Sequence, residues 1–244
     1  MAMRLAKCFR LGSIAHETKG NSEVQSRSIK TRVFNERRVS ATLGLQVQIQ
    51  NTNMRIWDIH PGYLNQSSLL AEHRELDALV AILRSATKKN SQDPEVKRWI
   101  GYGWAIKQRH KQVVCEMALR GYENSSVVTL RANKGIWPTT YIDKPDVQLT
   151  LLKEQYQFEQ AGRITLPKNP QALWSHYKYS VLARDPNRYK EFGKRLATQS
   201  VGFEQLASEL VELFRAPPSK GGIRNALQHM WGHVSHVSEH KGNI

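Results

Sequence analysis

The chain has 244 residues, 40% of them hydrophobic, which is enough for one large domain or two modest ones with apolar cores. The formal net charge of +15 at pH 7 favours a polyanionic partner, with a solvated basic surface as the alternative. No apolar run reaches the ~18 residues of a transmembrane helix, and Cys8 and Cys115 match neither a disulfide framework nor a zinc motif. We therefore expect no membrane association, and a reducing compartment, the cytoplasm, with association to the nucleoid.

Residues 1–53 are the most basic part of the chain, with 9 Lys and Arg against 3 Asp and Glu. They are rich in polar residues and show no sustained apolar period, which predicts a disordered basic extension. Three explanations remain open: a basic arm, an organellar transit peptide, or translated sequence upstream of a later start codon. We favour the third, because of the residues that begin at Met54.

A first helix is expected from a cap at Ser67 or Ser68 to about Lys88. Its apolar stripe consists of Leu69, Leu76, Val80 and Leu83. Glu72 and Glu75 border this stripe, and Arg74 points to the opposite side.

A second helix is expected to begin at Asp93 and Pro94 and to end at Gly121, a residue typical of helix C-termini. Its later part has an apolar face formed by Ile106, His110, Val113, Val114 and Met117. Lys107, Arg109 and Lys111 lie mostly off that face, as a solvated face or as a track for DNA.

Residues 122–171 are interrupted by prolines, with a short helix expected over 146–160. Further helices are expected over 173–183, 187–198, 203–214 and 223–237. The fold class is all-α, with two small helical modules joined by a Pro-containing irregular segment. The expected division is a disordered extension at 1–53, a first module at 54–150, a linker at 151–171 and a second module at 172–240.

Three segments of the first module carry a resemblance: MRIW at 54–57, LLAEHREL at 69–76 and RHKQVVCEMALRGY at 109–122. They resemble the pyrimidine-dimer DNA glycosylase/AP-lyase family, small all-helical repair enzymes best known from phage and called endonuclease V-like. The spacing from Arg55 to Glu72, Arg74 and Glu75 agrees with that family without gaps.

The resemblance implies a bifunctional mechanism. The α-amine of the N-terminal residue attacks C1′ of the damaged nucleotide, displaces the base and forms a Schiff base, and β-elimination then cuts the backbone. By position, Met54 supplies the amine and Glu75 is the essential glutamate beside it. An α-amine has a pKa near 8, so part of it is neutral at pH 7. With residues 1–53 attached, the nitrogen of Met54 is a peptide nitrogen and is not a nucleophile.

The resemblance makes Arg55 and Arg74 DNA contacts that act through phosphates. The candidate DNA-binding residues are Arg55, Glu72, Arg74, Lys107 and Arg109. The sequence departs from the family at Ala78, where the family has an arginine, and at Ser68, where it has a histidine.

Residues 172–238 contain LWSHYKYSVLARDPNRYKEFGKRLA and NALQHMWGHV. They resemble the YbgA-like helical domain, a family of unknown function, which implies no particular activity. His229, His233, His236 and His240 share a helical spacing, but no carboxylate or cysteine completes a recognised metal site, and we expect neither a metal nor an organic cofactor.

We therefore expect a glycosylase/AP lyase that acts on damaged pyrimidines or abasic sites in duplex DNA. The alternative is a non-catalytic nucleic-acid-binding protein that retains the scaffold, which Ala78, Ser68 and the internal position of Met54 favour.

Overall fold

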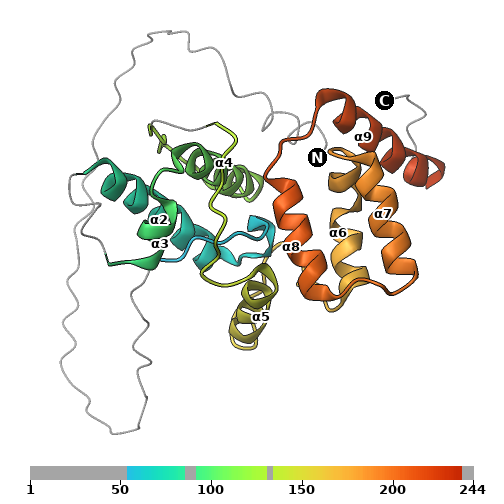
Figure 1. Ribbon diagram of the computed structural model, residues 1–244, viewed down its shortest axis with the longest axis horizontal. Helices are drawn as coiled ribbons and strands as arrows, with labels where there is room; N and C mark the ends of the chain where they lie inside the picture. Colours follow the sequence, from blue (N-terminus) through green and yellow to red (C-terminus); the bar gives the residue numbers. More distant parts are fainter. Residues whose placement is uncertain (1–53, 86–91, 131–133, 238–244) are drawn as a thin grey trace, which may run out of the picture. The chain divides into compact units, whose positions relative to one another are not determined.

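The computed structural model describes residues 54–85, 92–130 and 134–237 (Figure 1). Within these ranges every regular element is a helix, which confirms the all-α fold class. The expected disorder of residues 1–53 lies outside the described residues. No helix in the described part combines the length and apolar character needed to cross a membrane.

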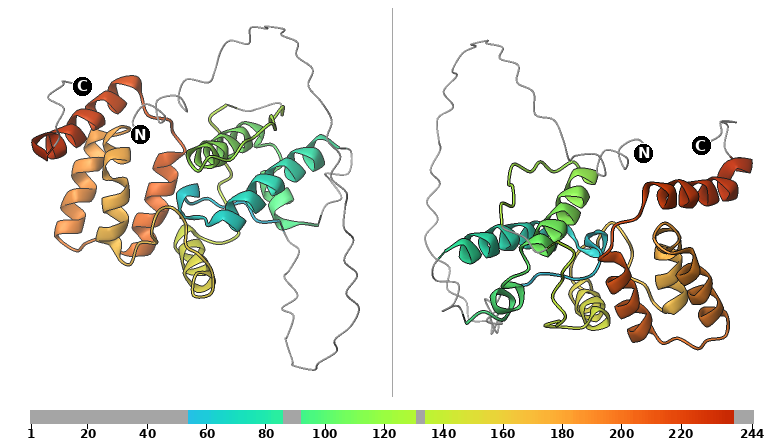
Figure 2. Two further views of the ribbon diagram at one scale, coloured as in Figure 1. Left: turned by 180° about the vertical axis from the view of Figure 1, so that it is seen from behind. Right: turned by 45° about the horizontal axis from the view of Figure 1, so that its top comes forward.

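The first half contains a 3₁₀ turn and four α-helices. They are η1 (Pro61–Tyr63), α2 (Gln66–Arg84), α3 (Pro94–Trp99), α4 (Gly103–Leu119) and α5 (Pro145–Gln155). The second half contains α6 (Pro170–Leu182), α7 (Pro186–Ala197), α8 (Phe203–Phe214), α9 (Lys220–Val234) and the 3₁₀ turn η3 (Ser235–Val237). Helices α6 and α7 lie side by side in both views of Figure 2, and α8 and α9 also pack on α6.

The cap of α2 differs from the expectation. Asn65, not Ser67 or Ser68, precedes the helix, and its Oδ1 accepts a hydrogen bond from the backbone nitrogen of Ser68 at 2.8 Å. Asn is as good an N-cap as Ser, and the chain already turns into the helix after η1. The helix ends at Arg84, and the expected end at Lys88 lies outside the described residues.

The expected second helix is wrong in one respect, because the structure divides it into α3 and α4. Gly101 lies between them with φ +88°, a conformation that glycine adopts without the penalty other residues incur. The end of α4 is as expected: Gly121 follows with φ +83°, and the next amide, that of Tyr122, donates to the carbonyl of Met117 at 2.9 Å.

The helix starts of the second half are marked by prolines and caps. Asp185 accepts hydrogen bonds from the nitrogens of Asn187 and Arg188, and Pro186 occupies the first turn of α7. Helix α9 begins at Lys220, earlier than expected, because Ser219 caps it and Gly222 belongs to its first turn. A Cβ at Gly222 would lie 2.0 Å from the carbonyl oxygen of Ala183, so only glycine allows this approach.

The buried core continues from the first half into the second. Residues of one hydrophobic cluster include Leu76 of α2, Val113 of α4, Leu152 of α5, Leu173 of α6 and Leu206 of α8. The described residues from Met54 onward accordingly belong to one compact unit. The expected boundaries of the two modules and of the linker stay predictions.

Candidate active site

Residues 54–58 form an extended segment whose backbone nitrogens are held by side chains. Five consecutive amides donate hydrogen bonds to three helical regions. The pairs are Met54 N to Asp93 Oδ2 (3.0 Å), Arg55 N to Glu75 Oε2 (3.1 Å), Ile56 N to Glu95 Oε1 (3.3 Å), Trp57 N to Glu72 Oε1 (3.1 Å) and Asp58 N to Gln148 Oε1 (2.9 Å).

The acceptors reach this segment because of where they lie on their helices. Glu72 and Glu75 are one turn apart on α2, so their side chains lie on the same side of the helix. Asp93 is the N-cap of α3 and Glu95 is in its first turn, while Gln148 belongs to α5. Side chains therefore accept the hydrogen bonds of this segment, whereas in a β-sheet the backbone of a neighbouring strand would accept them.

The two carboxylate oxygens of Asp93 accept hydrogen bonds from different segments. Its Oδ1 accepts hydrogen bonds from the nitrogens of Glu95 (2.8 Å) and Val96 (3.2 Å), which caps α3. Its Oδ2 accepts from the nitrogen of Met54 at 3.0 Å. The sequence predicted a helix start at Asp93 but not its contact with Met54, since these two residues lie far apart in the chain.

Glu75 is half-buried beside the start of the segment. Burial raises the pKa of its carboxyl group, and the neighbouring Glu72 raises it further, whereas the hydrogen bond from the nitrogen of Arg55 lowers it. The net direction is upward. A carboxyl group with a raised pKa exchanges its proton closer to neutral pH, which suits general acid–base chemistry.

The side chain of Arg55 lies at the edge of the site. Its Nη1 contacts Asp143 Oδ2 at 2.7 Å, and its guanidinium lies 5.1 Å from the ring centre of Trp57. The side chain of Arg55 is 39% exposed, so it is accessible to a large ligand. Arg74 is also exposed, on the side of α2 that the sequence predicted.

Arg109 and Glu72 form a buried ion pair between α4 and α2. Arg109 Nε and Nη2 contact the two carboxylate oxygens of Glu72 at 2.7 and 2.8 Å, and Arg109 Nη1 donates to the carbonyl of Ile59 at 2.7 Å. The side chains of Arg109 and Glu72 are 2% and 0% exposed. The expectation that Arg109 lies mostly off the buried face of its helix is wrong, whereas Lys107 is half-buried and Lys111 is exposed.

A second buried network supports the far end of the segment. Arg98 lies between Asp58 and Glu95, and its Nε donates to the carbonyl of Thr140 at 2.8 Å. Burial raises the pKa of Glu95 to about 7, although the charge of Arg98 opposes the shift. No local sequence pattern indicates this network, because its members come from three separate segments.

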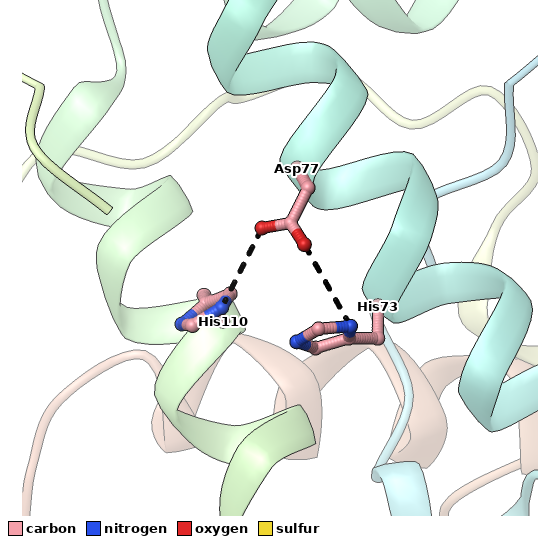
Figure 3. Close-up of side chains that lie close together, drawn as sticks. All are labelled: His73, Asp77 and His110. Carbon is pink, nitrogen blue, oxygen red and sulfur yellow. Dashed lines mark ion pairs between the residues drawn. The ribbon is translucent and has the colours of Figure 1, made fainter. Parts of the chain in front are cut away.

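One further group in the described ranges has the arrangement to hold a metal ion. His73 and Asp77 of α2 and His110 of α4 point toward one another (Figure 3). The group is separate from the carboxylates that hold residues 54–58.

Two family models match the chain. The model described as pyrimidine dimer DNA glycosylase matches residues 54–130, and that of a protein of unknown function, DUF1722, matches residues 178–242. The first match covers the extended segment and α2 to α4, and the second includes α7 to α9. No curated protein and no solved structure matches the chain.

Proposed function

Since residues 54–130 are a pyrimidine dimer DNA glycosylase domain, followed by a DUF1722 (YbgA-like) domain at 178–242, we propose that the protein is a DNA glycosylase and AP lyase. Its substrate is duplex DNA with damaged pyrimidines or abasic sites. The active form begins at Met54, so that the nitrogen of this residue is an α-amine. The supporting observation is the position of that nitrogen, 3.0 Å from Asp93 Oδ2 and one peptide unit from the amide that Glu75 holds.

The chemistry follows from the properties of an α-amine. Its pKa near 8 leaves a neutral fraction at pH 7, which attacks C1′ of the nucleotide. The base leaves, or the open-chain aldehyde of an abasic site reacts directly, and an imine to the enzyme results. β-Elimination then removes a proton from C2′ and expels the 3′ phosphate. A nucleotide rotated out of the duplex exposes C1′ to the amine.

Glu75 is the acid–base group of this mechanism. Its carboxylate balances the positive charge of the iminium and takes up or returns protons during elimination. The raised pKa of Glu75 keeps this exchange nearer to neutral pH than that of an ordinary glutamate. We assign to Asp93 the orientation of the amine, since Asp93 is the acceptor of the Met54 nitrogen.

DNA contacts are assigned to the exposed arginines. Arg55 and Arg74 present accessible guanidinium groups near the segment and on α2, where they suit phosphate contacts. Glu72 and Arg109 are assigned a supporting role, because both are buried and hold Trp57 and Ile59. Lys107 is half-buried and contributes positive charge to the same helix as Arg109.

The test is covalent trapping of protein that begins at Met54 on abasic-site duplex DNA with borohydride. We expect a stable adduct through Met54, and strand cleavage when borohydride is absent. Glu75→Gln abolishes cleavage because the proton acceptor is removed, and Asp93→Asn slows imine formation while Asn still caps α3. The 244-residue chain, whose Met54 nitrogen is acylated, serves as the control and gives no adduct at Met54. Absence of an adduct with the shorter form would falsify the proposal.

The second candidate is a non-catalytic nucleic-acid-binding protein. The observation in its favour is that Ala78 and Ser68 stand at positions where the family it resembles has an arginine and a histidine. Such a protein binds damaged and intact duplexes equally, with an affinity that falls steeply with salt, and cleaves neither. Binding curves for damaged and intact duplexes, together with a cleavage assay on both, distinguish the two candidates.

A further inference from the structure

We propose that His73, Asp77 and His110 bind a divalent transition-metal ion, with zinc as the best match to the donor set. Imidazole nitrogens and a carboxylate oxygen are donors that Zn²⁺ accepts, and three protein ligands leave one position for water. This site is independent of the proposed repair activity, because none of its three side chains holds residues 54–58.

The fold brings the three side chains together. His73 and Asp77 are four residues apart on α2, a spacing that places both on one face of the helix. His110 comes from α4, which packs against α2. Figure 3 shows the carboxylate of Asp77 facing both imidazole rings.

The distances are close to those of a metal site. Asp77 Oδ2 lies 3.8 Å from His73 Nδ1, and Asp77 Oδ1 lies 3.9 Å from His110 Nε2. The three donor atoms of the group are all within 4.8 Å of one another. Ligands bonded tetrahedrally to zinc at ~2.0–2.2 Å are about 3.3–3.5 Å apart, so a small inward movement is required. The side chain of Asp77 is 41% exposed and has room to make it.

Metal ligation requires neutral imidazoles, since a proton and a metal compete for the same nitrogen. We therefore expect zinc binding at this site to weaken as the pH falls.

The neighbouring polar groups orient the rings. His73 Nε2 lies 2.7 Å from Asn124 Oδ1, which accepts a hydrogen bond only if Nε2 carries the proton. That tautomer leaves His73 Nδ1 free to bind a metal on the side of Asp77. Ser126 Oγ is 2.9 Å from His110 Nε2, the nitrogen that faces Asp77, so a bound metal would replace this hydrogen bond. The contact of His73 Nε2 with Asn124 lies on the far side of the ring from Asp77, and outer hydrogen bonds of this kind fix ligand orientation in metal sites.

The test measures zinc bound to the chelator-treated 244-residue chain by elemental analysis after equilibrium dialysis. We expect about one ion per chain, a higher Tm with zinc because the ion binds the folded state, and visible absorption bands with Co²⁺ as the probe. His110→Ala and Asp77→Asn weaken binding by about tenfold or more. Asp77→Asn is included because its exposed position makes misfolding a poor explanation of lost binding.

The matched control is His229→Ala, which removes an exposed histidine of α9 and leaves binding unchanged. Two outcomes overturn the proposal. If the folded chain retains no zinc, the three side chains serve only the hydrogen-bond network with Asn124 and Ser126. If His229→Ala removes the zinc while His110→Ala retains it, the ion belongs to the C-terminal histidines.

Discussion

Glu72 is important for stability because it is the buried ion-pair partner of Arg109. Glu72→Gln leaves the Arg109 guanidinium buried without its full countercharge, and we expect a loss of about 3–5 kcal/mol in the free energy of unfolding. Urea denaturation followed by circular dichroism measures it. Arg74→Gln, an exposed change on the same helix, stays within about 0.5 kcal/mol. A loss below 1 kcal/mol for Glu72→Gln would mean that Arg109 finds another acceptor.

The same pair shows what a local pattern misses at this scale. Arg109 lies three residues after Ile106 and four before Val113, so helical spacing places it on their buried face, where Glu72 and the carbonyl of Ile59 satisfy its nitrogens. Periodicity therefore indicates the burial of Arg109, but it does not reveal the partners, which come from distant segments. The role of Glu75 is a prediction from its position in the family motif, whereas the contact of Asp93 with Met54 has no motif to indicate it.

At the scale of the element, Asn65 controls the start of α2. Asn65→Ala removes the cap and the hydrogen bond from Nδ2 to Glu159 Oε2 at 2.7 Å, and we expect a cost of about 1–2 kcal/mol. Thermal unfolding of both proteins measures the difference. Ser68→Ala is the control for the alternative cap and costs about 0.5 kcal/mol or less. Equal effects of the two changes would contradict the assignment.

Some helix boundaries have a signal in the nearby sequence, and others do not. Pro186 and Gly121 act within a few residues, so the beginning of α7 and the end of α4 were predictable. Gly101 also has a left-handed conformation, but the pattern of buried residues continues across it, and the break between α3 and α4 was missed. The early start of α9 follows from the Ser219 cap, whereas the close approach of Gly222 to Ala183 is a tertiary contact with no local signal.

On the scale of the whole molecule, Glu116 connects α4 to the segment that follows α5. Its carboxylate is 2% exposed and accepts from Arg163 Nε and Nη2 at 2.8 and 2.7 Å and from Arg120 Nε at 2.8 Å. Burial opposes ionisation, but these hydrogen bonds and charges outweigh it and lower the pKa of Glu116 below 4.5. The ion pairs therefore stabilise the fold above that pH, and the contribution is lost as pH falls through the lowered pKa.

Glu116→Gln tests this pH dependence. At pH 7 we expect the variant to lose about 3 kcal/mol in the free energy of unfolding, because two arginines lose their partner. The difference between the proteins shrinks in acid, where the native carboxyl group is protonated as well. Urea denaturation at a series of pH values from 7 downward measures it. A difference that is independent of pH would contradict the role of the charge.

The contacts between the two halves are also tertiary in origin. The rings of Tyr63 and Tyr177 meet edge to face at 6.1 Å, and Trp137 Nε1 donates to the carbonyl of Arg215 at 3.2 Å. Tyr177 lies in a helix that the sequence predicts and Trp137 in the segment expected to be irregular, whereas the 3₁₀ turn of Tyr63 was not predicted. Their pairing was not predictable, because one sequence contains no signal that connects them.

The five amide hydrogen bonds of residues 54–58 also fix where along the segment an N-terminal amine would lie. Each nitrogen has its own acceptor, so sliding the segment by one residue would mismatch all five hydrogen bonds, and its register is fixed. One added or missing N-terminal residue therefore moves a terminal amine by about 3.3 Å along the extended chain. A displacement of about 1 Å already slows a positioned reaction strongly. In the proposed enzyme, the number of residues before Ile56 would thus affect the rate as much as the chemical nature of the first residue does.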